Sequence, residues 1–357
     1  MKNKTVYIAL SVDVLHHGHI NLINHARKYG KIVAGLITDS AISTQKRIPL
    51  LNFSQRKKIL ENISGISKVI AQNEWEYSKN ILKLKPDFMV HGDDWKYEKD
   101  KLIRSSTLKA LKKIGGKLIE IPHTKNISSH SIKERLHSES TLPSNRQAIL
   151  KRLLHAKKLS RFIEAHSPLS AIIAEQIFYK NKSGKKIEFD GFWSSSLTDS
   201  TLKGKPDIEV LDLNQRLLNI NDIFDVTTKP LIIDIDTGGK IEHLEINLKT
   251  IERSGASAVI MEDKKGLKKN SLFGNKVKQE QENIKEFSKK ISASKKATNN
   301  NLMIIARIES LILGKPLSDA ILRAKKYVEA GADGIMIHSK DKNPKEIFKF
   351  AEKFKKK

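Results

Sequence analysis

The chain has 357 residues and a formal net charge of +26, with 66 lysines and arginines against 40 acidic residues. Its length predicts two domains, each large enough to bury a core. The absence of cysteine excludes disulfides, thiolate zinc sites and thiol nucleophiles, so oxygen or imidazole must hold any metal. Because there is neither an apolar run long enough to span a bilayer nor an apolar signal segment, we expect a cytoplasmic protein without membrane insertion.

The excess of lysine is spread along the whole chain rather than gathered in one basic block. Aromatic residues make up 6% of the sequence and do not alternate with the basic residues, as a base-stacking surface would require. We therefore expect no nucleic-acid partner. A diffuse positive charge instead favours small anionic, phosphorylated substrates.

The first part of the chain alternates short apolar segments with helical ones, which predicts a parallel sheet covered on both faces. Such sheets bind ligands at the carboxyl ends of their strands, where the strand order reverses. Helices are expected at 20–29 and 55–63. The predicted strands are 6–12, 32–38, 68–71, 87–93 and 117–123.

A polar, proline-containing stretch without apolar periodicity lies near residue 140. We expect a linker at 139–145 between a domain of residues 1–138 and a domain of residues 146–357, which opens with an amphipathic helix. The second domain repeats the strand and helix alternation, and each of its strands ends in polar residues, as in a (β/α)₈ TIM-type barrel. Only six of eight strands are expected, so the last two βα units are missing; the strands are 162–167, 189–196, 229–236, 257–263, 302–309 and 334–340.

His16 and His19 flank Gly18 at the start of the first predicted helix. Glycine lets the backbone approach a ligand, and the helix start presents free N–H groups to an anion. Imidazoles there can donate hydrogen bonds to a phosphate that gains charge in a transition state. Two surface histidines would explain an isolated pattern of this kind equally well, but the motifs that accompany it favour the functional interpretation.

With those motifs, residues 6–136 resemble the small cytidylyltransferases of the HxGH nucleotidyltransferase superfamily, which implies a Rossmann-like domain. The motifs are Asp13, 16–19, Lys46-Arg47, 55–57, 91–96 and 124–129. The resemblance implies transfer of a cytidylyl group from CTP to a phosphate or phosphonate oxygen, with Mg²⁺ on the leaving pyrophosphate. His16 and His19 would be catalytic. The implied nucleotide-binding residues are Asp13, His16, His19, Lys46, Arg47, Asp93, Asp94, Trp95, Thr124 and Ser128.

This part of the chain also departs from the family pattern. Ser64 and His123 stand where the family commonly has arginine, and Asn126 stands where it has glycine. The phosphate cradle is therefore less cationic than the pattern implies, and the acceptor stays open: a phosphonate such as 2-aminoethylphosphonate, phosphocholine or glycerol phosphate.

Three carboxylates close two successive strands of the second domain. Asp234 and Asp236 lie two apart on a predicted strand and so should point to one face, and Glu262 ends the next strand. Helix caps and solvated strand ends would explain any one of them. Together they suit Mg²⁺, which keeps several waters and awaits an anionic substrate. Lys268 and Asn270 can fold over that substrate.

From Arg146 onward the chain resembles phosphoenolpyruvate mutase of the isocitrate lyase superfamily. The residues that carry the resemblance lie in 162–171, 193–197, 205–207, 234–238, 262–271, 306–309 and 336–340. It implies Mg²⁺ served by Asp234, Asp236 and Glu262, mostly through water. Substrate binding is implied for Trp193, Ser195 and Ser271, and catalysis for Asp207, Lys268, Asn270, Arg307 and His338, with Asp207 and Lys268 on gating loops.

We therefore expect a fused enzyme of phosphonate biosynthesis that converts phosphoenolpyruvate to phosphonopyruvate and activates a phosphonate with CTP. Lyase chemistry is disfavoured because the lyases use a cysteine that this chain lacks. A phosphonopyruvate hydrolase and a non-catalytic, ligand-binding protein stay open as alternatives. We expect a homo-oligomer formed through the barrel. For the missing units we expect an incomplete sequence; a separate chain that completes the barrel, or a defective barrel, stays possible.

Overall fold

The computed structural model describes residues 4–45, 48–96, 101–122, 124, 143–181, 186–266, 268–270, 278–298 and 301–354. Contacts divide the chain into two compact units. The first comprises Met1–Glu139 with His155–Lys158 and Lys180–Lys186, and the second comprises the remaining residues. Helix α7 (Pro143–Ala156) begins inside the stretch expected as a linker, so residues 143–145 are helical.

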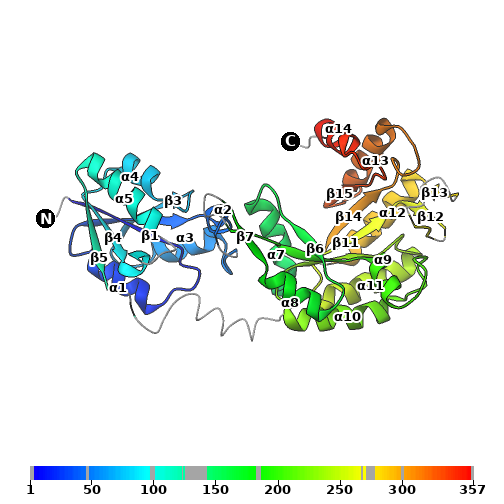
Figure 1. Ribbon diagram of the computed structural model, residues 1–357, viewed down its shortest axis with the longest axis horizontal. Coiled ribbons are helices and arrows are strands. Elements are labelled where there is room, and N and C mark those ends of the chain that lie inside the picture. Colours follow the sequence, from blue (N-terminus) through cyan, green and yellow to red (C-terminus); the bar gives the residue numbers. More distant parts are fainter. Residues whose placement is uncertain are drawn as a thin grey trace. The chain divides into compact units, whose positions relative to one another are not determined.

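The first unit contains a five-stranded parallel sheet, which confirms the predicted strands (Figure 1). The strand order is β3-β2-β1-β4-β5, so the direction of winding reverses between β1 and β4. This reversal is the place where open α/β sheets bind ligands. The strands are β1 (Thr5–Leu10), β2 (Lys31–Ile37), β3 (Ile66–Gln72), β4 (Phe88–Gly92) and β5 (Lys117–Ile121).

Alternate residues of β1 enter two separate cores, one on each face of this sheet. Val6, Ile8 and Leu10 belong to one core, and Tyr7 and Ala9 to the other. Helices α1 and α3 contribute to the first core, whereas α4 and α5 contribute to the second. The helical elements are α1 (His17–Ala26), α2 (Asp39–Ile42), α3 (Phe53–Glu61), α4 (Ser78–Leu84), the 3₁₀ turn η1 (Asp93–Lys96) and α5 (Lys101–Ile114).

The second unit is built on a six-stranded parallel sheet whose strands follow one another in chain order, as in a βα-barrel. All six predicted strands are present, and together they form part of a barrel wall. They are β6 (Phe162–Glu164), β9 (Gly191–Ser194), β10 (Leu231–Asp234), β11 (Ala258–Glu262), β14 (Met303–Ile308) and β15 (Gly334–Ile337). The chain also forms two short two-stranded ribbons, β7 (Phe178–Lys180) with β8 (Lys186–Glu188), and β12 (Lys264–Lys265) with β13 (Glu280–Gln281); the β12–β13 ribbon lies in the second unit.

Helices cover one face of this sheet and pack against one another in succession (Figure 1). Their apolar side chains form the largest core with alternate strand residues. The intervening strand residues form a smaller cluster on the other face, where Leu150 of α7 also packs. The helices are α8 (Pro168–Gln176), α9 (Ser196–Leu202), α10 (Leu213–Val226), α11 (Ile241–Ser254), α12 (Ile284–Ala297), α13 (Leu317–Glu329) and α14 (Lys345–Lys353). Within the described residues, none of the helices has the length and apolar character needed to cross a bilayer.

Candidate functional site

Strand alternation places the polar strand ends of the second unit on the sheet face opposite the largest core, the same face on which Leu150 of α7 packs. Residues of this face belong to the smaller apolar cluster, and the next residue of the same parity on each strand is polar. The apolar members are Ile232, Ile260, Ile305 and Met336, and the polar residues that follow them are Asp234, Glu262, Arg307 and His338. These side chains meet because the carboxyl ends of parallel strands share one edge of the sheet.

Arg307 is the central cation of this edge. Its Nη1 lies 3.1 Å from Oδ2 of Asp234, and its Nη2 lies 2.6 Å from Oε2 of Glu262. Its Nε donates to Oε1 of Glu309 at 2.5 Å. Burial alone would lower the pKa of Arg307, but the three carboxylates raise it above its ordinary value. The guanidinium is therefore permanently charged and held in a fixed orientation.

Asp236 also lies at this edge of the sheet, but the backbone conformation that brings it there differs from the one predicted. Strand β10 ends at Asp234, and Asp236 lies beyond it with a φ of 56°, a left-handed backbone. The prediction that strand alternation aligns the two aspartates is therefore wrong. They nevertheless converge, since the backbone N–H of Asp236 donates to Oδ1 of Asp234 at 2.9 Å.

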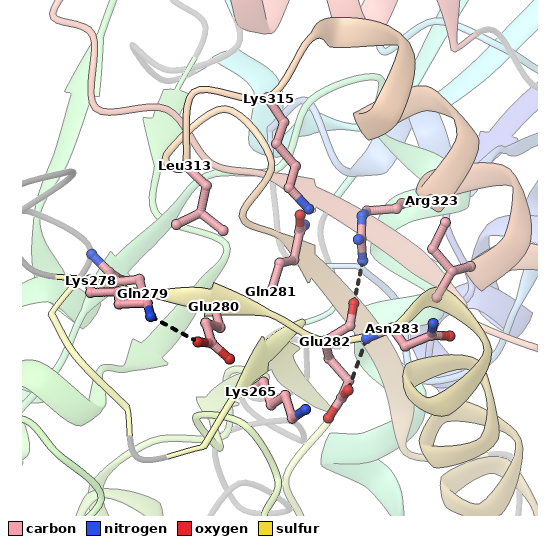
Figure 2. A pocket seen from close by; sticks show the side chains of 11 residues that line it. Lys265, Lys278, Gln279, Glu280, Gln281, Glu282, Asn283, Leu313, Lys315 and Arg323 are labelled. Atoms are coloured by element: carbon pink, nitrogen blue, oxygen red, sulfur yellow. Dashed lines mark hydrogen bonds and ion pairs between the residues drawn. The ribbon is translucent and has the colours of Figure 1, made fainter.

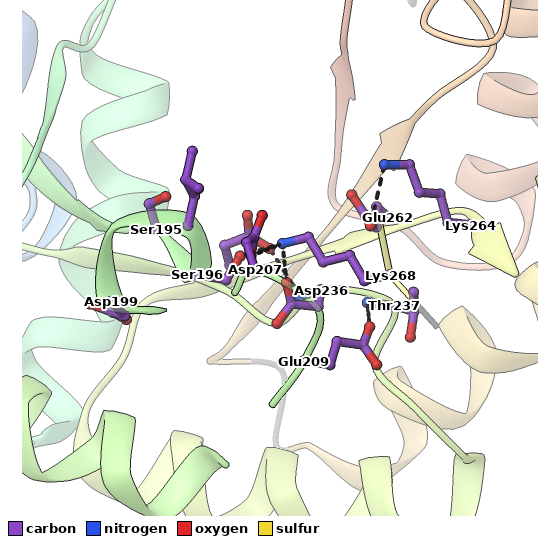
Figure 3. A network of polar contacts seen from close by, with 12 residues as sticks. Ser195, Ser196, Asp199, Asp207, Glu209, Asp236, Thr237, Glu262, Lys264 and Lys268 are labelled. Carbon is purple, nitrogen blue, oxygen red and sulfur yellow. Dashed lines mark hydrogen bonds and ion pairs between the residues drawn. The ribbon is translucent and has the colours of Figure 1, made fainter. Parts of the chain in front are cut away.

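Lys268 inserts its ammonium among these acidic groups (Figure 3). Its Nζ lies 2.9 Å from Oδ1 of Asp207 and donates to Oγ of Ser196 at 2.6 Å, and it also pairs with Asp236. Burial acts to lower the pKa of Lys268, but the surrounding carboxylates, Asp236 first, raise it above its ordinary value. Lys268 and Asp207, both expected on gating loops, are thus in direct contact.

Glu309 and Lys264 complete the cluster, and neither was predicted as a site residue. Glu309 is fully buried, and its Oε1 lies 2.9 Å from Nδ1 of His338. Its pKa falls below the ordinary value because the contacts with His338 and Arg307 outweigh the effect of burial. Lys264 lies 3.5 Å from Glu309 and 3.8 Å from Glu262.

Among the described residues of this cluster, carboxylates outnumber cationic side chains. Ion pairs connect five carboxylates with three cationic side chains: Asp207, Asp234, Asp236, Glu262 and Glu309 with Lys264, Lys268 and Arg307. Burial is the largest cause that raises the pKa of Glu262 to about 8, and burial and the charge of Asp234 raise the pKa of Asp236. Glu262 is therefore largely protonated near neutral pH, and a divalent cation at this place would favour its ionised form.

The carboxylates also provide the oxygen donors that a divalent cation prefers. Within the described residues, neither carboxylate oxygen of Glu262 accepts a well-aligned hydrogen bond, although Arg307 and Lys264 lie nearby. No three His, Asp or Glu side chains of the described part of the chain form a ready-made ligand cluster. A cation here would therefore depend on water and substrate oxygens for much of its coordination shell.

The other predicted residues of this half occupy different positions. Ser195 caps helix α9, where its Oγ accepts from the N–H of Thr198 at 3.4 Å. Trp193 packs on the same sheet face as Ile232 and Ile260, and its buried indole N–H has no hydrogen-bond partner within the described residues. Asn270 lies two residues beyond Lys268, and Ser271 is outside the described residues.

Two buried arginines on helices α10 and α13 form hydrogen bonds next to the strand ends. The sequence analysis did not predict either of them. Arg216 of α10 donates to Oδ2 of Asp199 at 2.8 Å and to the carbonyl of Asp234. Arg323 of α13 donates to Oδ2 of Asp263, the neighbour of Glu262, at 3.1 Å. Tyr327 donates to the same oxygen at 2.7 Å. These contacts fix the backbone from which the site carboxylates project.

A cavity of about 780 Å³ lies beside the β12–β13 ribbon (Figure 2). Both acidic and basic side chains line it, among them Lys265, Glu280, Gln281, Lys315 and Arg323. None of the predicted catalytic residues belongs to its lining. Chemistry is therefore better placed at the strand ends than in this cavity.

In the first unit, the HxGH segment lies at the point where the strand order reverses. His16 caps helix α1 after the loop that follows β1. A Cβ atom added at Gly18 would lie 3.0 Å from the His16 ring and 3.5 Å from Cβ of Thr124, so glycine keeps this approach open. Thr124 also accepts a hydrogen bond from Nδ2 of Asn21 at 3.3 Å.

His16 and His19 are in contact, with ring centroids 3.9 Å apart. Nδ1 of His19 accepts from the backbone N–H of His16 at 3.3 Å, so the neutral ring carries its proton on Nε2. Burial, and next the charge of His16, lower the pKa of His19 to about 4. At neutral pH His19 is therefore an uncharged hydrogen-bond donor.

Hydrogen bonds of two buried side chains, Asp13 and Arg56, fix the backbone around the loop that follows β1. Oδ1 of the buried Asp13 accepts from the N–H of Leu50 at 2.6 Å. Arg56 is fully buried, donates to the carbonyl of Ser11 and lies 2.6 Å from Asp39. Asp13 and Arg56 thus position backbone around the HxGH segment. Lys46, Arg47 and Ser128 lie outside the described residues.

The segment Gly92-Asp93-Asp94-Trp95 begins with the last residue of β4, the neighbour of β1 in the sheet. Trp95 is 2% exposed and stacks on His91, with ring centroids 3.8 Å apart and an interplanar angle of 8°. Its indole N–H donates to Oε1 of Glu120 at 2.8 Å. Arg104 also donates to Glu120, and these contacts lower the pKa of Glu120 to about 2 despite partial burial. Asp93 and Asp94 occupy the η1 turn, with Asp94 exposed.

These folds and sites define a two-unit α/β protein in which a nucleotide-binding type of sheet accompanies part of a βα-barrel. The family model for phosphoenolpyruvate phosphomutase matches residues 150–357, and the cytidylyltransferase-like model matches residues 11–135. The chain thus belongs to the phosphoenolpyruvate phosphomutase family through its second unit and to the cytidylyltransferase-like family through its first, which confirms the predicted fusion.

Individual relatives agree with this division. The chain is 37% identical over 203 residues to phosphonopyruvate hydrolase of Variovorax sp. (strain Pal2), a match covering 56% of this chain and 66% of the relative. It is 36% identical over 208 residues to phosphoenolpyruvate phosphomutase of Tetrahymena pyriformis, covering 58% and 66%. It is 32% identical over 126 residues to glycerol-3-phosphate cytidylyltransferase of Bacillus subtilis (strain 168), covering 35% and 90%.

A solved structure also matches the second unit. It is phosphonopyruvate hydrolase in complex with oxalate and Mg²⁺, with 34% sequence identity and a TM-score of 0.51. The match covers 59% of this chain and 69% of that chain. The chain spans just under two thirds of the length of the hydrolase and mutase relatives named above.

Proposed function

We propose that the protein is a bifunctional enzyme of phosphonate biosynthesis. The second unit rearranges phosphoenolpyruvate to phosphonopyruvate with Mg²⁺, and the first transfers a cytidylyl group from CTP to a phosphonate. Membership of the two families supports phosphonate-type chemistry in general. The observation that carries the mutase assignment is the buried cluster in which Arg307 and Lys268 face Asp234, Asp236 and Glu262.

The residues of this cluster provide what transfer of a phosphoryl group needs. A loose, metaphosphate-like transfer depends on charge stabilisation and exclusion of water more than on covalent help. Arg307 and Lys268 are buried cations that can hold phosphoryl oxygens, and Glu309 orients His338 beside Arg307. Asp207, held by Lys268, shields the reacting phosphorus from water.

Asp234, Asp236 and Glu262 would hold Mg²⁺, largely through water, and the ion would favour the ionised forms of these carboxylates and stabilise the negative charge of the enolate. The solved relative with oxalate and Mg²⁺ supports this choice of metal. Its likeness covers only the second unit, so Mg²⁺ in the first unit is proposed from the chemistry of CTP alone.

Phosphonopyruvate hydrolysis is a second candidate, because a relative at 37% identity has that name. The two reactions diverge when phosphonopyruvate and Mg²⁺ are supplied. A mutase returns phosphoenolpyruvate, whereas a hydrolase consumes water and releases pyruvate and orthophosphate. ³¹P NMR distinguishes these products, and orthophosphate as the sole phosphorus product would overturn the mutase assignment.

For the first unit, we propose attack by a phosphonate oxygen on the α-phosphorus of CTP, which forms a cytidylyl phosphonate and releases pyrophosphate. His19 supplies an uncharged N–H donor beside the helix start, and Gly18 keeps the approach open. The acceptor 2-aminoethylphosphonate is proposed because the other unit supplies the carbon–phosphorus bond. Glycerol phosphate is the rival, since relatives with that acceptor in their names match this unit.

Pyrophosphate release separates the acceptors when CTP and Mg²⁺ are combined with 2-aminoethylphosphonate, phosphocholine or glycerol phosphate. The proposal expects the highest kcat/KM for the phosphonate. A preference for glycerol phosphate would overturn the acceptor assignment but leave the cytidylyltransferase intact. Binding of CTP without turnover of any acceptor would instead support a non-catalytic, ligand-binding unit.

A further inference from the structure

Lys264 is a buried lysine of the site to which the proposed reaction assigns no role. It is 3% exposed and lies on β12, two residues after Glu262. Its Nζ lies 3.8 Å from Oε1 of Glu262 and 3.5 Å from Oε2 of Glu309. The same Nζ donates to the backbone carbonyl of Lys269 at 2.9 Å. One ammonium therefore contacts three separate segments of the site.

Each of these partners leads to a residue placed in the reaction. Glu309 accepts from Nε of Arg307 at 2.5 Å and contacts Nδ1 of His338 at 2.9 Å. Glu262 pairs with Nη2 of Arg307 at 2.6 Å. The Lys269 carbonyl lies in the chain between Lys268 and Asn270, so its location fixes where these two side chains begin.

A buried ammonium is costly unless acceptors surround it, and Glu262 and Glu309 satisfy that need. Simple charge balance would require only these two carboxylates. The directed hydrogen bond to the Lys269 carbonyl adds a constraint on the backbone beside Lys268, whose own Nζ reaches Ser196 at 2.6 Å and Asp207 at 2.9 Å. That additional contact distinguishes positioning from neutralisation.

We propose that Lys264 is a positioning residue, which fastens the Lys268–Asn270 segment to Glu262 and Glu309 and so sets the place of the Lys268 ammonium above the strand ends. Its effect on turnover rests on the proposed mutase function, but its effect on the backbone does not. A change at Glu262 or Glu309 is transmitted to Lys268 through one shared cation.

Lys265 is the matched control, because it is the same residue type one position further along the same strand. Successive side chains of a strand point to opposite sides. Lys264 points to Glu262 (Figure 3), whereas Lys265 is exposed and lines the cavity of Figure 2. Lys265→Met therefore removes the same charge from the same strand as Lys264→Met does, but the Lys265 side chain does not contact the site.

The experiment measures amide hydrogen exchange of the full chain without ligand, in Lys264→Met, Lys264→Arg and Lys265→Met. We expect exchange at residues 268–270 to rise about tenfold or more in Lys264→Met, the effect of losing one charge-assisted hydrogen bond. Lys264→Arg should recover much of the protection, and Lys265→Met should match the unsubstituted chain. Unchanged exchange at 268–270 in Lys264→Met, with β10 and β14 still protected, would overturn the proposal.

If Lys264→Met loses protection throughout β10 and β14, the variant has not folded. The combination Lys264→Met with Glu309→Gln then removes one carboxylate along with the cation and relieves the imbalance. Exchange at 268–270 should still rise in that variant, and protection equal to that of Glu309→Gln alone would refute the role of Lys264.

Kinetics provide a second, separable measurement. With phosphonopyruvate as the substrate and Mg²⁺ present, the fold decrease in kcat of Lys264→Met should be at least ten times the fold increase in its KM. The reason is that Lys268 is misplaced while Arg307 still binds the substrate. Failure of the unsubstituted chain to turn over would refute the proposed mutase function only, since the exchange measurement needs no turnover. Faster exchange with unchanged kcat would refute the coupling to Lys268.

Discussion

Arg307 and Glu262 are register partners at the ends of β14 and β11, and their side chains meet with Nη2 2.6 Å from Oε2. The same guanidinium reaches Asp234 at 3.1 Å. Arg307 therefore bridges two of the three carboxylates proposed to hold Mg²⁺. The cation that orients the carboxylates is also the cation proposed to hold the phosphoryl group, so loss of this one side chain should affect both folding and turnover.

Replacing Arg307 with methionine tests this double role. Asp234, Glu262 and Glu309 would remain buried without their shared cation, which costs about 3 kcal/mol or more of unfolding free energy. The proposed conversion of phosphonopyruvate should fall roughly 100-fold or more, as expected when one preorganised donor is removed. Arg253→Met on the exposed side of α11 is the control and should change neither quantity. If Arg307→Met unfolds at the same denaturant concentration as the unsubstituted chain, the predicted loss of unfolding free energy is contradicted.

Lys268 and Lys269 provide a second matched pair. Lys268 pairs with Asp207 and Asp236, whereas the Lys269 ammonium donates to the carbonyl of Lys278 at 2.7 Å, away from the carboxylates. We expect Lys268→Met to lower kcat/KM for phosphonopyruvate by about 100-fold, because a desolvated cation over the phosphoryl group is lost. Lys269→Met should stay within about threefold of the unsubstituted rate, and equal losses in the two variants would contradict the placement of Lys268.

The convergence of the second site was predictable because it follows from sheet geometry. Glu262 ends β11, Arg307 is the penultimate residue of β14 and His338 directly follows β15. The carboxyl ends of parallel strands meet at one edge of the sheet. Asp236 was predicted at the site because it was expected to lie two residues after Asp234 on one strand, and the structure contradicts that reason. Its φ of 56° turns the chain back, so a hydrogen bond to Asp234 replaces strand alternation as the cause of their proximity.

The supporting arginines could not be assigned from sequence in the same way. Arg216 lies among buried apolar residues of α10, and Arg323 lies near Tyr327 on α13. An arginine on the apolar face of an amphipathic helix signals a buried ion pair. Its partner, however, comes from another element, as Asp199 does for Arg216, and the sequence does not specify which strand end a helix covers.

The pKa of His19 predicts a pH dependence for the first unit. It is about 4 in the folded chain against 6.5 ordinarily, because burial disfavours the charged ring. Protonation below pH 6.5 therefore favours the unfolded state. The stability that neutral His19 contributes is present above pH 6.5 and is lost as the pH falls towards 4, by about 3 kcal/mol.

His19→Gln should flatten this dependence, since glutamine does not titrate. Amide exchange of α1 between pH 4 and pH 7.5 provides the measurement, and an NMR titration of the His19 ring provides the pKa directly. The exposed His25 of the same helix is the control, and His25→Gln should leave the pH profile unchanged. A His19 ring that titrates near 6.5 would refute the prediction.

Glu120 is expected to hold Trp95 in the position that the proposed CTP site requires. Its Oε1 accepts from the Trp95 indole at 2.8 Å and from Nε of Arg104 at 2.9 Å, and its pKa of about 2 keeps it ionised. Because the folded pKa lies below the ordinary 4.5, the stabilisation is present above pH 4.5 and disappears as the pH falls through 2.

Glu120→Ala should therefore lower the stability of the first unit by about 1 kcal/mol at neutral pH. With its N–H unpaired, Trp95 can tilt from the His91 ring, and the KM for CTP should rise several-fold while the kcat changes less. Glu61→Ala is the control, since Glu61 forms only a half-exposed pair with Lys57 at 3.4 Å among its described contacts. Tryptophan fluorescence and pyrophosphate release measure the two effects, and a shifted emission with an unchanged KM would separate Trp95 from CTP binding.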